Sequence, residues 1–236
     1  SLLTERREGL HERTAQALEI RHASSIGEIT ETLAHHYGQT PRAEKAVHYM
    51  AEAGAKSLRV YSLPEADLRL RQVVALIETV PDCADDTFLT DVLLQLARVN
   101  YFRADMNGIQ SLLKPHLARV EALEDPKRLA DFLFELGYSL VFGEDPKAGM
   151  ALFERSRSIA TEIGDELVIG RVAMGEIWYQ MTFVDSLPET RARINVLEEI
   201  ALAAGRKARD IWLISKTYTA MSLYGGIIGN PKSARD

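Results

Sequence analysis

The chain repeatedly places proline one or two residues after a side chain that caps helices. Six of its eight prolines do so, and they follow Thr40, Ser62, Asp125, Asp145, Ser186 and Asn230. Proline is tolerated in the first turn of a helix, because the N–H that it lacks has no partner there. A Ser, Thr, Asp or Asn before it accepts a hydrogen bond from the free amides of that turn. This spacing therefore predicts one helix after another.

The apolar periodicity between these caps predicts helices and no strand. In the first helix, Leu3, Leu10, Ala17 and Leu18 share a face, and such an apolar stripe normally turns to the core. The predicted helices cover residues 3–21, 25–37, 42–60, 62–79, 87–103, 106–122, 127–142, 147–163, 166–183, 189–204 and 208–228.

Several residues mark where these helices begin and end. Ser25–Glu28 and Ser62–Glu65 have the spacing of capping boxes at helix N-termini. Gly164 and Gly205 stand where a left-handed residue is expected to end a helix. Pro115 falls inside a helical pattern, so we expect a kink or an end near Lys114.

The predicted helix pairs share a repeated contact pattern. A small residue in the first helix is followed twelve residues later by a small or apolar one, and four residues further on by a large apolar one. A small side chain lets two helices cross closely, while the larger one fills the adjacent groove. Such pairs cannot bury their apolar faces alone, so we expect them to stack. The three sets are Ala34–Ala46–Met50, Ala97–Ile109–Leu113 and Gly137–Gly149–Phe153, and Gly175 begins a fourth.

Composition narrows the class of protein. Hydrophobic residues make up 46% of the 236 residues and charged residues 26%, which is ordinary for a globular protein. The net charge of -6 argues against a nucleic-acid partner, since no global basic field is present. No apolar run reaches the roughly 18 residues of a membrane span. The single cysteine, Cys83, cannot form an internal disulfide, and we expect a reducing, cytoplasmic location.

The segment Leu33–Tyr37, followed by Ala46, Met50 and Ala53, resembles the tetratricopeptide repeat (TPR). That motif has Leu, a small residue and Tyr in its first helix, then Ala, a large apolar residue and Ala in its second. The resemblance implies an all-α fold, a right-handed superhelix of antiparallel helix pairs with about 10–11 helices. Later units match more weakly, and the repeat spacing is irregular near Gly54.

A second resemblance covers residues 2–80. The blocks Leu2–Arg7, Leu33–Tyr37 and Glu44–Tyr49 look like the junction that follows the ATPase module in bacterial class III adenylate/guanylate cyclase-like proteins and ATPase-containing transcription activators. This resemblance implies that residues 1–24 are the tail of an ATPase module and that residues 25–236 form the repeat array. The chain contains no Walker A loop and no cyclase metal-binding aspartates, so the resemblance assigns these residues no activity.

The chain also repeats the start of a helix pair near its end. The segment 143–148, Gly-Glu-Asp-Pro-Lys-Ala, opens a second helix, and the segment 229–234, Gly-Asn-Pro-Lys-Ser-Ala, has the same form. We therefore expect an array truncated inside its last repeat, and a chain that is a piece of a larger protein.

Aromatic side chains recur on successive first helices and are the main candidates for binding a partner. In the repeat register they line a concave face, where aromatic anchors can hold an extended or helical peptide. The alternative is that they pack inside the array, as aromatic stripes at helical spacing commonly do. The candidate partner-binding residues are Arg98, Tyr101, Phe102, Phe134, Tyr138, Phe142, Glu176 and Tyr179.

Other polar groups lack the spacing of a reactive site. His35 and His36 are adjacent, so they point about 100° apart on a helix and cannot easily hold one metal ion. The basic run from Arg191 to Arg209 is interrupted by glutamates and is typical of a solvated face. Cys83 has no evident basic neighbour to activate its thiol. We predict no catalytic residue, no cofactor and no metal for this chain.

Three functions remain open at this stage. The first is a non-catalytic TPR-like scaffold in a cytoplasmic signalling protein, binding a protein, a peptide or another domain of its own parent chain. The second is a regulatory or effector-sensing arm of an ATPase-containing transcription activator. The third is a helical domain that binds a small ligand, for which Glu176 with Tyr179 and Arg98 with Tyr101 offer polar groups.

Overall fold

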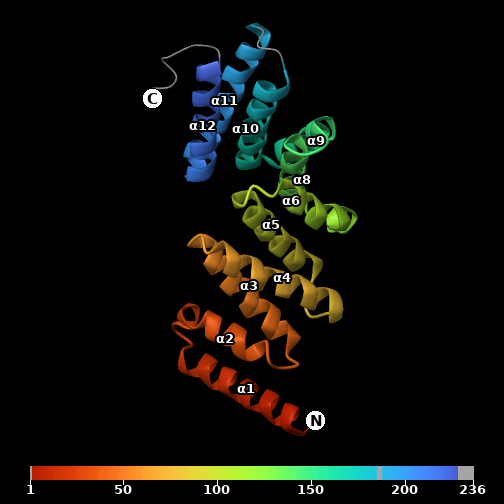
Figure 1. Ribbon diagram of the computed structural model, residues 1–236, viewed down its shortest axis with the longest axis vertical. Helices are drawn as coiled ribbons and strands as arrows, with labels where there is room; N and C mark the ends of the chain where they lie inside the picture. Colours follow the sequence, from red (N-terminus) through yellow and green to blue (C-terminus); the bar gives the residue numbers. More distant parts are fainter. Residues whose placement is uncertain (1, 185–187, 228–236) are drawn as a thin grey trace. The chain divides into compact units, whose positions relative to one another are not determined.

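The computed structural model describes residues 2–184 and 188–227, and every regular element in those ranges is helical (Figure 1). The all-α class expected from the sequence is confirmed. The chain divides into two compact units, unit 1 up to Leu112 and unit 2 from Leu113. Among the described helices, none combines the length and the apolar character that crossing a bilayer requires.

Unit 1 contains five complete helices and most of a sixth. They are α1 (Leu2–Arg21), α2 (Thr30–Tyr37), α3 (Ala43–Arg59), α4 (Leu63–Thr79), α5 (Asp86–Phe102) and α6 (Met106–Leu113), with a 3-10 turn, η1 (Ile26–Glu28), before α2. Unit 2 begins with a second 3-10 turn. Its elements are η2 (Lys114–His116), α7 (Leu117–Glu121), α8 (Pro126–Val141), α9 (Pro146–Ile163), α10 (Glu166–Phe183), α11 (Pro188–Ala208) and α12 (Ile211–Ile227).

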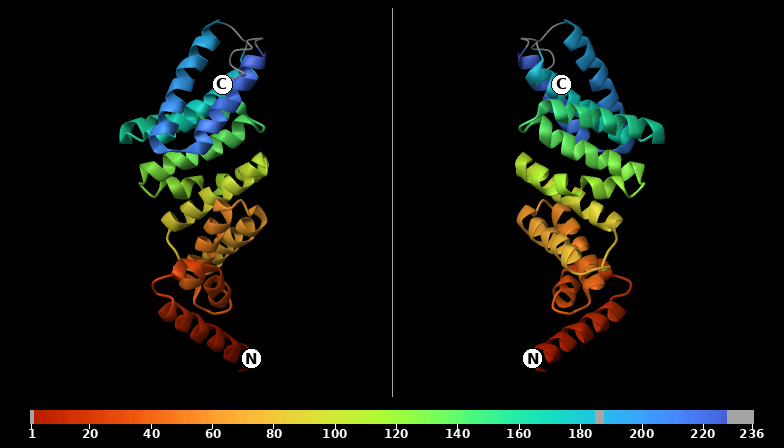
Figure 2. Two further views of the ribbon diagram at one scale, coloured as in Figure 1. Left: turned by 90° about the vertical axis from the view of Figure 1, so that its left-hand side faces the viewer. Right: turned by 90° about the vertical axis from the view of Figure 1, so that its right-hand side faces the viewer.

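Helices stack on their neighbours within each unit (Figure 2). In unit 2 each helix packs against the next one along the chain, and α10 also packs against α8 and α12. Unit 1 follows the same rule from α1 to α5, with a further contact between α3 and α5. Short connections make such neighbours antiparallel, and contacts to the next helix and the next but one are typical of a solenoid.

Two of the helix starts predicted from a capping residue followed by proline are confirmed by hydrogen bonds to the capping aspartate. The Asp125 carboxylate accepts a hydrogen bond from the Arg128 N–H at 3.0 Å, and that of Asp145 accepts one from the Ala148 N–H at 2.9 Å. Pro64 and Pro188 lie in the first turns of α4 and α11. The Ser186 and Asn230–Pro231 signals fall outside the described residues.

The two predicted capping boxes are wrong in detail. Among the described residues, neither Ser25 nor Ser62 makes a side-chain bond to the helix that it precedes. Their ψ angles are 34° and 70°, away from the extended region usual for an N-cap. At these angles the short serine hydroxyl does not reach the free amides, whereas aspartate carries its oxygens one bond further out.

Glycines end one helix and bring two others together. Gly164 has φ 70° and ends α9, as predicted. The expected helix end at Gly205 is wrong, because α11 continues to Ala208 and Arg209 adopts the left-handed conformation instead. A Cβ on Gly205 would lie 2.8 Å from the Ile214 side chain, so this glycine allows α11 and α12 to approach closely.

Pro115 interrupts its helix where the sequence predicted. The helix α6 ends at Leu113, and η2 follows over Lys114–His116 before α7 resumes. Proline removes one backbone donor and clashes with the preceding turn, which accounts for the break. With α6 and α7 counted as one interrupted helix, the described helices fill the eleven predicted positions.

The predicted contact between small and large residues brings helices very close together around Phe153. Its ring is fully buried on α9 between two glycines on neighbouring helices. A Cβ would lie 2.9 Å from the ring if added to Gly137 of α8, and 2.5 Å if added to Gly175 of α10. In unit 1, Gly54 of α3 makes room for Leu70 of α4 in the same way, and α3 continues through it.

We expect Gly137→Ala and Gly175→Ala each to lower the free energy of unfolding by about 1–3 kcal/mol, the usual cost of overpacking a tight core. Gly226 on α12 is a matched control, since no described atom lies within 4 Å of the place that a Cβ would occupy there. Gly226→Ala should leave stability unchanged or raise it by up to about 1 kcal/mol. Urea unfolding followed by circular dichroism measures all three, and equal effects would contradict this account of Phe153.

Candidate functional site

The predicted partner-binding residues of unit 1 come together at the end of α5. Tyr101 and Phe102 have ring centroids 5.6 Å apart, and Arg98 is exposed one turn earlier on the same helix. Tyr61, from the turn between α3 and α4, places its ring 5.1 Å from that of Phe102. We call Tyr61, Tyr101 and Phe102 the aromatic cluster. Tyr61 is not among the predicted residues, because nothing local in the sequence links that turn to α5.

Tyr61 ends α3 in a left-handed backbone conformation, which Asp82, Ala104, Glu124 and Arg209 also adopt. Its φ is 57°, in the left-handed region that glycine normally fills after a helix. For a bulky residue this conformation is uncommon and costs about 1–2 kcal/mol. The side chain is nevertheless 66% exposed, and the neighbouring Val60 is 71% exposed. The strain is therefore not explained by burial of the ring.

In unit 2 the predicted aromatic residues run from the core toward the surface. Phe134 and Tyr138 on α8 are buried, and Phe134 stacks on Phe153 with centroids 5.8 Å apart. From Tyr138 the ring contacts continue to Phe142, at 4.7 Å, and from there to Trp178, at 6.1 Å. Phe134 and Tyr138 therefore pack inside the array, which was the alternative to a partner-binding role, and α8 packs against both α9 and α10.

Tyr179 lies apart from this series of rings. It is half-buried on α10, and its ring contacts the exposed Phe183 at a centroid distance of 5.4 Å. The two ends of the predicted ladder, Tyr101 and Tyr179, belong to different compact units. A single ladder through both units stays a prediction.

Glu176 is fully buried and joins three helices of unit 2. Its carboxylate lies 2.6 Å from the guanidinium of Arg157 on α9 and 3.1 Å from that of Arg193 on α11. Burial raises the pKa of Glu176, and the two arginines oppose that shift only in part. The group is thus an internal tie between α9, α10 and α11, which the sequence prediction of a partner contact did not anticipate.

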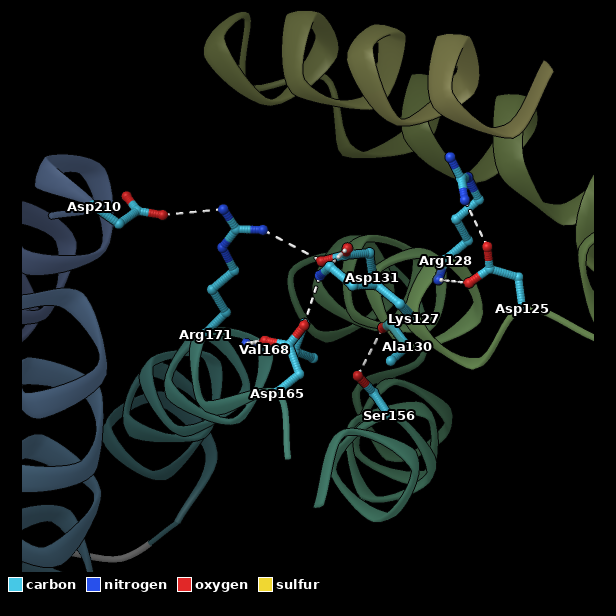
Figure 3. A network of polar contacts seen from close by, with 10 residues as sticks. All are labelled: Asp125, Lys127, Arg128, Ala130, Asp131, Ser156, Asp165, Val168, Arg171 and Asp210. Carbon is cyan, nitrogen blue, oxygen red and sulfur yellow. Dashed lines mark hydrogen bonds and ion pairs between the residues drawn. The ribbon is translucent and has the colours of Figure 1, made fainter. Parts of the chain in front are cut away.

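A network of ion pairs links the first helices of three successive pairs in unit 2 (Figure 3). Lys127 on α8 lies 2.6 Å from Asp165, which caps α10, and 3.1 Å from Asp131. Arg171 on α10 bridges Asp131, at 3.3 Å, and Asp210, at 3.0 Å. Asp210 in turn accepts a bond from the Leu213 N–H at the start of α12.

The residues of this network are regularly spaced in the sequence, a signal that could have predicted it. Asp131, Arg171 and Lys216 each stand six residues after a capping aspartate, which is Asp125, Asp165 or Asp210. Charge at that repeat position changes sign from α8 to α10, so those two helices attract each other there, whereas α10 and α12 both carry a cation at it. The pKa of Asp165 is held below its usual range by bonds from Lys127 and from the α10 backbone, which outweigh burial. The ion pairs of Lys127 and Arg171 with the three aspartates link α8, α10 and α12.

Near the network, an open hollow of about 430 Å³ surrounds the turn between α9 and α10. Its charged groups are paired with each other. Lys127 contacts Asp165, and Lys207 lies 2.7 Å from Glu166. Within the described residues, no group of three or more metal-binding side chains converges. Cys83 is buried, and burial raises the pKa of its thiol.

The first helix contradicts its sequence prediction. Ala15 is the one buried residue of α1 among those described, whereas Leu3 is 80% and Leu10 58% exposed. Leu3, Leu10 and Ala17 of the predicted apolar stripe therefore face outward, Leu18 is half-buried, and a polar side faces α2. This orientation is fixed by α2 and α3, which present tyrosines, a lysine and histidines to α1 rather than an apolar surface.

Glu19 anchors that polar side of α1. It accepts hydrogen bonds from the hydroxyls of Tyr37, at 2.6 Å, and Tyr49, at 2.5 Å, and from Lys45 at 2.8 Å. The two tyrosine rings stack with centroids 5.5 Å apart. Burial raises the pKa of Glu19, but the three donors outweigh it and lower that pKa overall. Burial and Glu19 together raise the pKa values of Tyr37 and Tyr49.

Histidines make a second contact between α1 and α2. His11 Nδ1 lies 2.9 Å from His36 Nδ1, and the two ring centroids are 5.0 Å apart. Burial, together with the neighbouring His11 and His35, lowers the pKa of His36. Further along, Glu12 forms an ion pair with Arg42 at 2.6 Å. The histidines therefore pack between α1 and α2.

Comparison with known proteins supports the fold. No protein-family model matches this sequence, and no curated protein matches it. Among solved structures, the chain is similar to BtubC (BKLC) from P. vanneervenii, with a TM-score of 0.59 and 12% sequence identity. The match covers 98% of this chain and 86% of that chain. At this identity, the similarity shows a shared fold and nothing further.

The lowered pKa of Glu19 predicts how acid affects unit 1. A carboxyl whose pKa is lower in the folded state stabilises that state above its unfolded pKa, near 4.3, and the contribution is lost as pH falls through the folded value. We expect Glu19→Gln to lower stability at pH 7 and to flatten the loss of stability between about pH 5 and pH 3. Urea unfolding across that pH range measures this.

Glu5→Gln is the matched control, since Glu5 is exposed on the same helix. It should leave both the stability and its acid dependence close to those of the unmodified chain. An identical pH profile for the two variants would contradict the role given to Glu19.

Proposed function

We propose that this chain is a non-catalytic helical-repeat module that binds a protein or peptide and serves as a regulatory scaffold in a cytoplasmic signalling protein. The stacked helix pairs of each unit support this, because such arrays present extended surfaces built from successive helices. The buried charges support it too, since Glu176 and Arg171 are engaged in holding helices together.

The aromatic cluster is the observation that carries the proposal. Tyr61 keeps an exposed ring in a backbone conformation that glycine would adopt without strain. Residues held in sparsely populated backbone conformations cluster at active sites, ligand clamps and switch regions. A few residues supply most of the binding energy at protein interfaces, and tyrosine and arginine are enriched among them, while large aromatic rings bury much apolar area. The cluster is therefore our candidate for the surface that receives a peptide.

Arg98 indicates the chemistry of that peptide. Arg98 is exposed. It precedes Tyr101 by three residues and Phe102 by four, so the three side chains share one side of α5. Arg98 has no ion-pair partner within the part of the chain that the structure describes. A guanidinium beside aromatic rings favours a peptide with an apolar side chain next to a carboxylate.

The parent protein is the second part of the proposal. Residues 2–80 resemble the region that follows an ATPase module in cyclase-like proteins and in ATPase-containing transcription activators. On that basis we propose that the array is a regulatory arm, which responds to a bound partner and alters the output of the module before it. The packing of α1 directly on α2 supports a physical connection between residues 1–24 and the array.

Peptide selection tests the surface. Peptides selected from a randomised library on the purified chain should lose at least about tenfold in affinity when Tyr101 or Phe102 is changed to Ala, the effect expected of interface anchors. Tyr218→Ala is the control, because Tyr218 is an exposed tyrosine on α12, away from α5 along the chain. Circular dichroism checks that each variant is folded. Peptides that bind all variants equally would overturn this assignment.

Deletion tests the regulatory role. In the parent protein, removing residues 25–236 should change the rate of nucleotide turnover, or the output of the following domain, and abolish its response to the selected peptide. Turnover measured for both proteins, with and without that peptide, decides the matter. Identical rates in all four conditions would refute the regulatory arm while leaving peptide binding intact.

A further inference from the structure

The outward face of α1 carries leucines where a helix normally meets solvent with charge. Leu2, Leu3, Leu10 and Ile20 are exposed, at 78%, 80%, 58% and 81%. Leu3, Leu10 and Ala17 follow one another at seven-residue spacing, so they form a line along the helix. α2 covers the opposite side, and α1 is the outermost helix of unit 1 in both views of Figure 2.

Charge on α1 is divided between its two sides. Glu8, Glu12 and Glu19 repeat on the side that packs against α2, and Glu5 lies at the edge. The arginines share the outward side with the leucines. Arg6 and Arg13 alternate with Leu3 and Leu10, which makes a cationic and apolar stripe. Within the described residues the arginines of this helix form no ion pair, and they are Arg6, Arg7, Arg13 and Arg21.

Gly9 leaves an open space on this face where a side chain is missing, and we call this space the notch. Gly9 lies in the middle of α1, where glycine costs about 0.5–1 kcal/mol relative to alanine. An open hollow of about 450 Å³ surrounds it and is lined by Leu2, Glu5, Arg6, Gly9, Leu10 and Arg13. A Cβ on Gly9 would meet no described atom within 4 Å.

Other helical glycines in this chain show what such a notch does. Gly54 receives the Leu70 side chain, and Gly205 receives that of Ile214. In both places a large apolar side chain of an adjacent helix fills the space that a Cβ would take. Gly9 has the same feature with the flanking leucines exposed, so the notch is shaped for a side chain from another helix.

We propose that the outward face of α1 binds an acidic amphipathic helix of a second protein, with one large apolar side chain seated at Gly9. The arginines match carboxylates, which guanidinium groups bind in a bidentate manner. The leucine line matches an apolar stripe repeating at heptad spacing.

A helix whose outward face is cationic and apolar also has the character of a membrane-surface anchor, and two features favour the protein partner. The helix α1 contains no Trp, Tyr or Phe, the side chains that commonly insert at the edge of a bilayer. A notch at Gly9 gives no advantage on a lipid surface, whereas it lets two helices approach closely. This surface is separate from the aromatic cluster, and its argument does not depend on that one.

A designed peptide tests the proposal on the full chain. The probe is a labelled helix of about 20 residues with leucine or phenylalanine at the first and fourth positions of each heptad and glutamate at the flanking positions. Fluorescence anisotropy should show binding that weakens as salt rises from about 50 to about 200 mM, since ion pairs at a surface are screened. A peptide with lysine in place of glutamate should bind at least about tenfold more weakly.

Variants place the binding on α1. Gly9→Leu fills the notch, and the double variant Arg6→Glu with Arg13→Glu reverses the charge, so each should weaken binding at least about tenfold. The matched controls are Gly226→Leu, at another open helical glycine, and Arg59→Glu, at an exposed arginine of α3. Both controls should bind the probe like the unmodified chain, and circular dichroism verifies folding.

Three results would overturn the proposal. They are no binding of the acidic probe, equal binding by Gly9→Leu, and tighter arginine-dependent binding to vesicles of phosphatidylserine and phosphatidylcholine than to the probe. Tyr101→Ala separates the two surfaces, because it should leave probe binding unchanged even if it abolishes binding of the selected peptides. Loss of probe binding in Tyr101→Ala would also count against an independent site on α1.

Discussion

The described part of unit 2 depends on how closely its helices approach the Phe153 ring. Two neighbouring helices approach the ring closely because each presents a glycine there, Gly137 on α8 and Gly175 on α10. Phe134 extends the same packed layer by stacking on the ring. Glu176 follows Gly175 directly. Where α10 approaches α9 at Gly175, the Glu176 carboxylate is therefore also buried. Its arginine partners on α9 and α11 are thus a consequence of that packing.

Two glutamates that link helices in this protein differ in burial and in the direction of their pKa shifts. Glu19 is partly open to solvent and receives three donors, which lower its pKa despite burial. Glu176 is fully enclosed, and two arginines do not offset the cost of removing its charge from water, so its pKa rises. The first arrangement holds a terminal helix to the stack, whereas the second fixes the relative positions of three packed helices. The cost of removing such buried charges from water can exceed their mutual attraction, whereas removing one partner leaves an uncompensated buried charge.

The candidate surfaces show where sequence reasoning stops. Arg98, Tyr101 and Phe102 are near neighbours on one helix, so helical spacing was enough to group them. Tyr61 joined them only through the packing of α3, α4 and α5. The apolar line of α1 was visible in the sequence, but its direction was not. Periodicity defines two sides of a helix, and the choice between them belongs to the surface against which the helix packs.

The amino-acid sequence alone determined the helical class, the order and approximate bounds of eleven helices, the break at Pro115 and the close contacts of Gly137 and Gly175. These are local or nearly local properties, set by caps, backbone limits and side-chain size. Tertiary structure alone decided that Glu176 is a buried tie, that Gly205 brings two helices together instead of ending one, and that α1 faces its leucines outward. Each of these outcomes depends on what a distant segment places opposite the residue, and no short-range pattern contains that information.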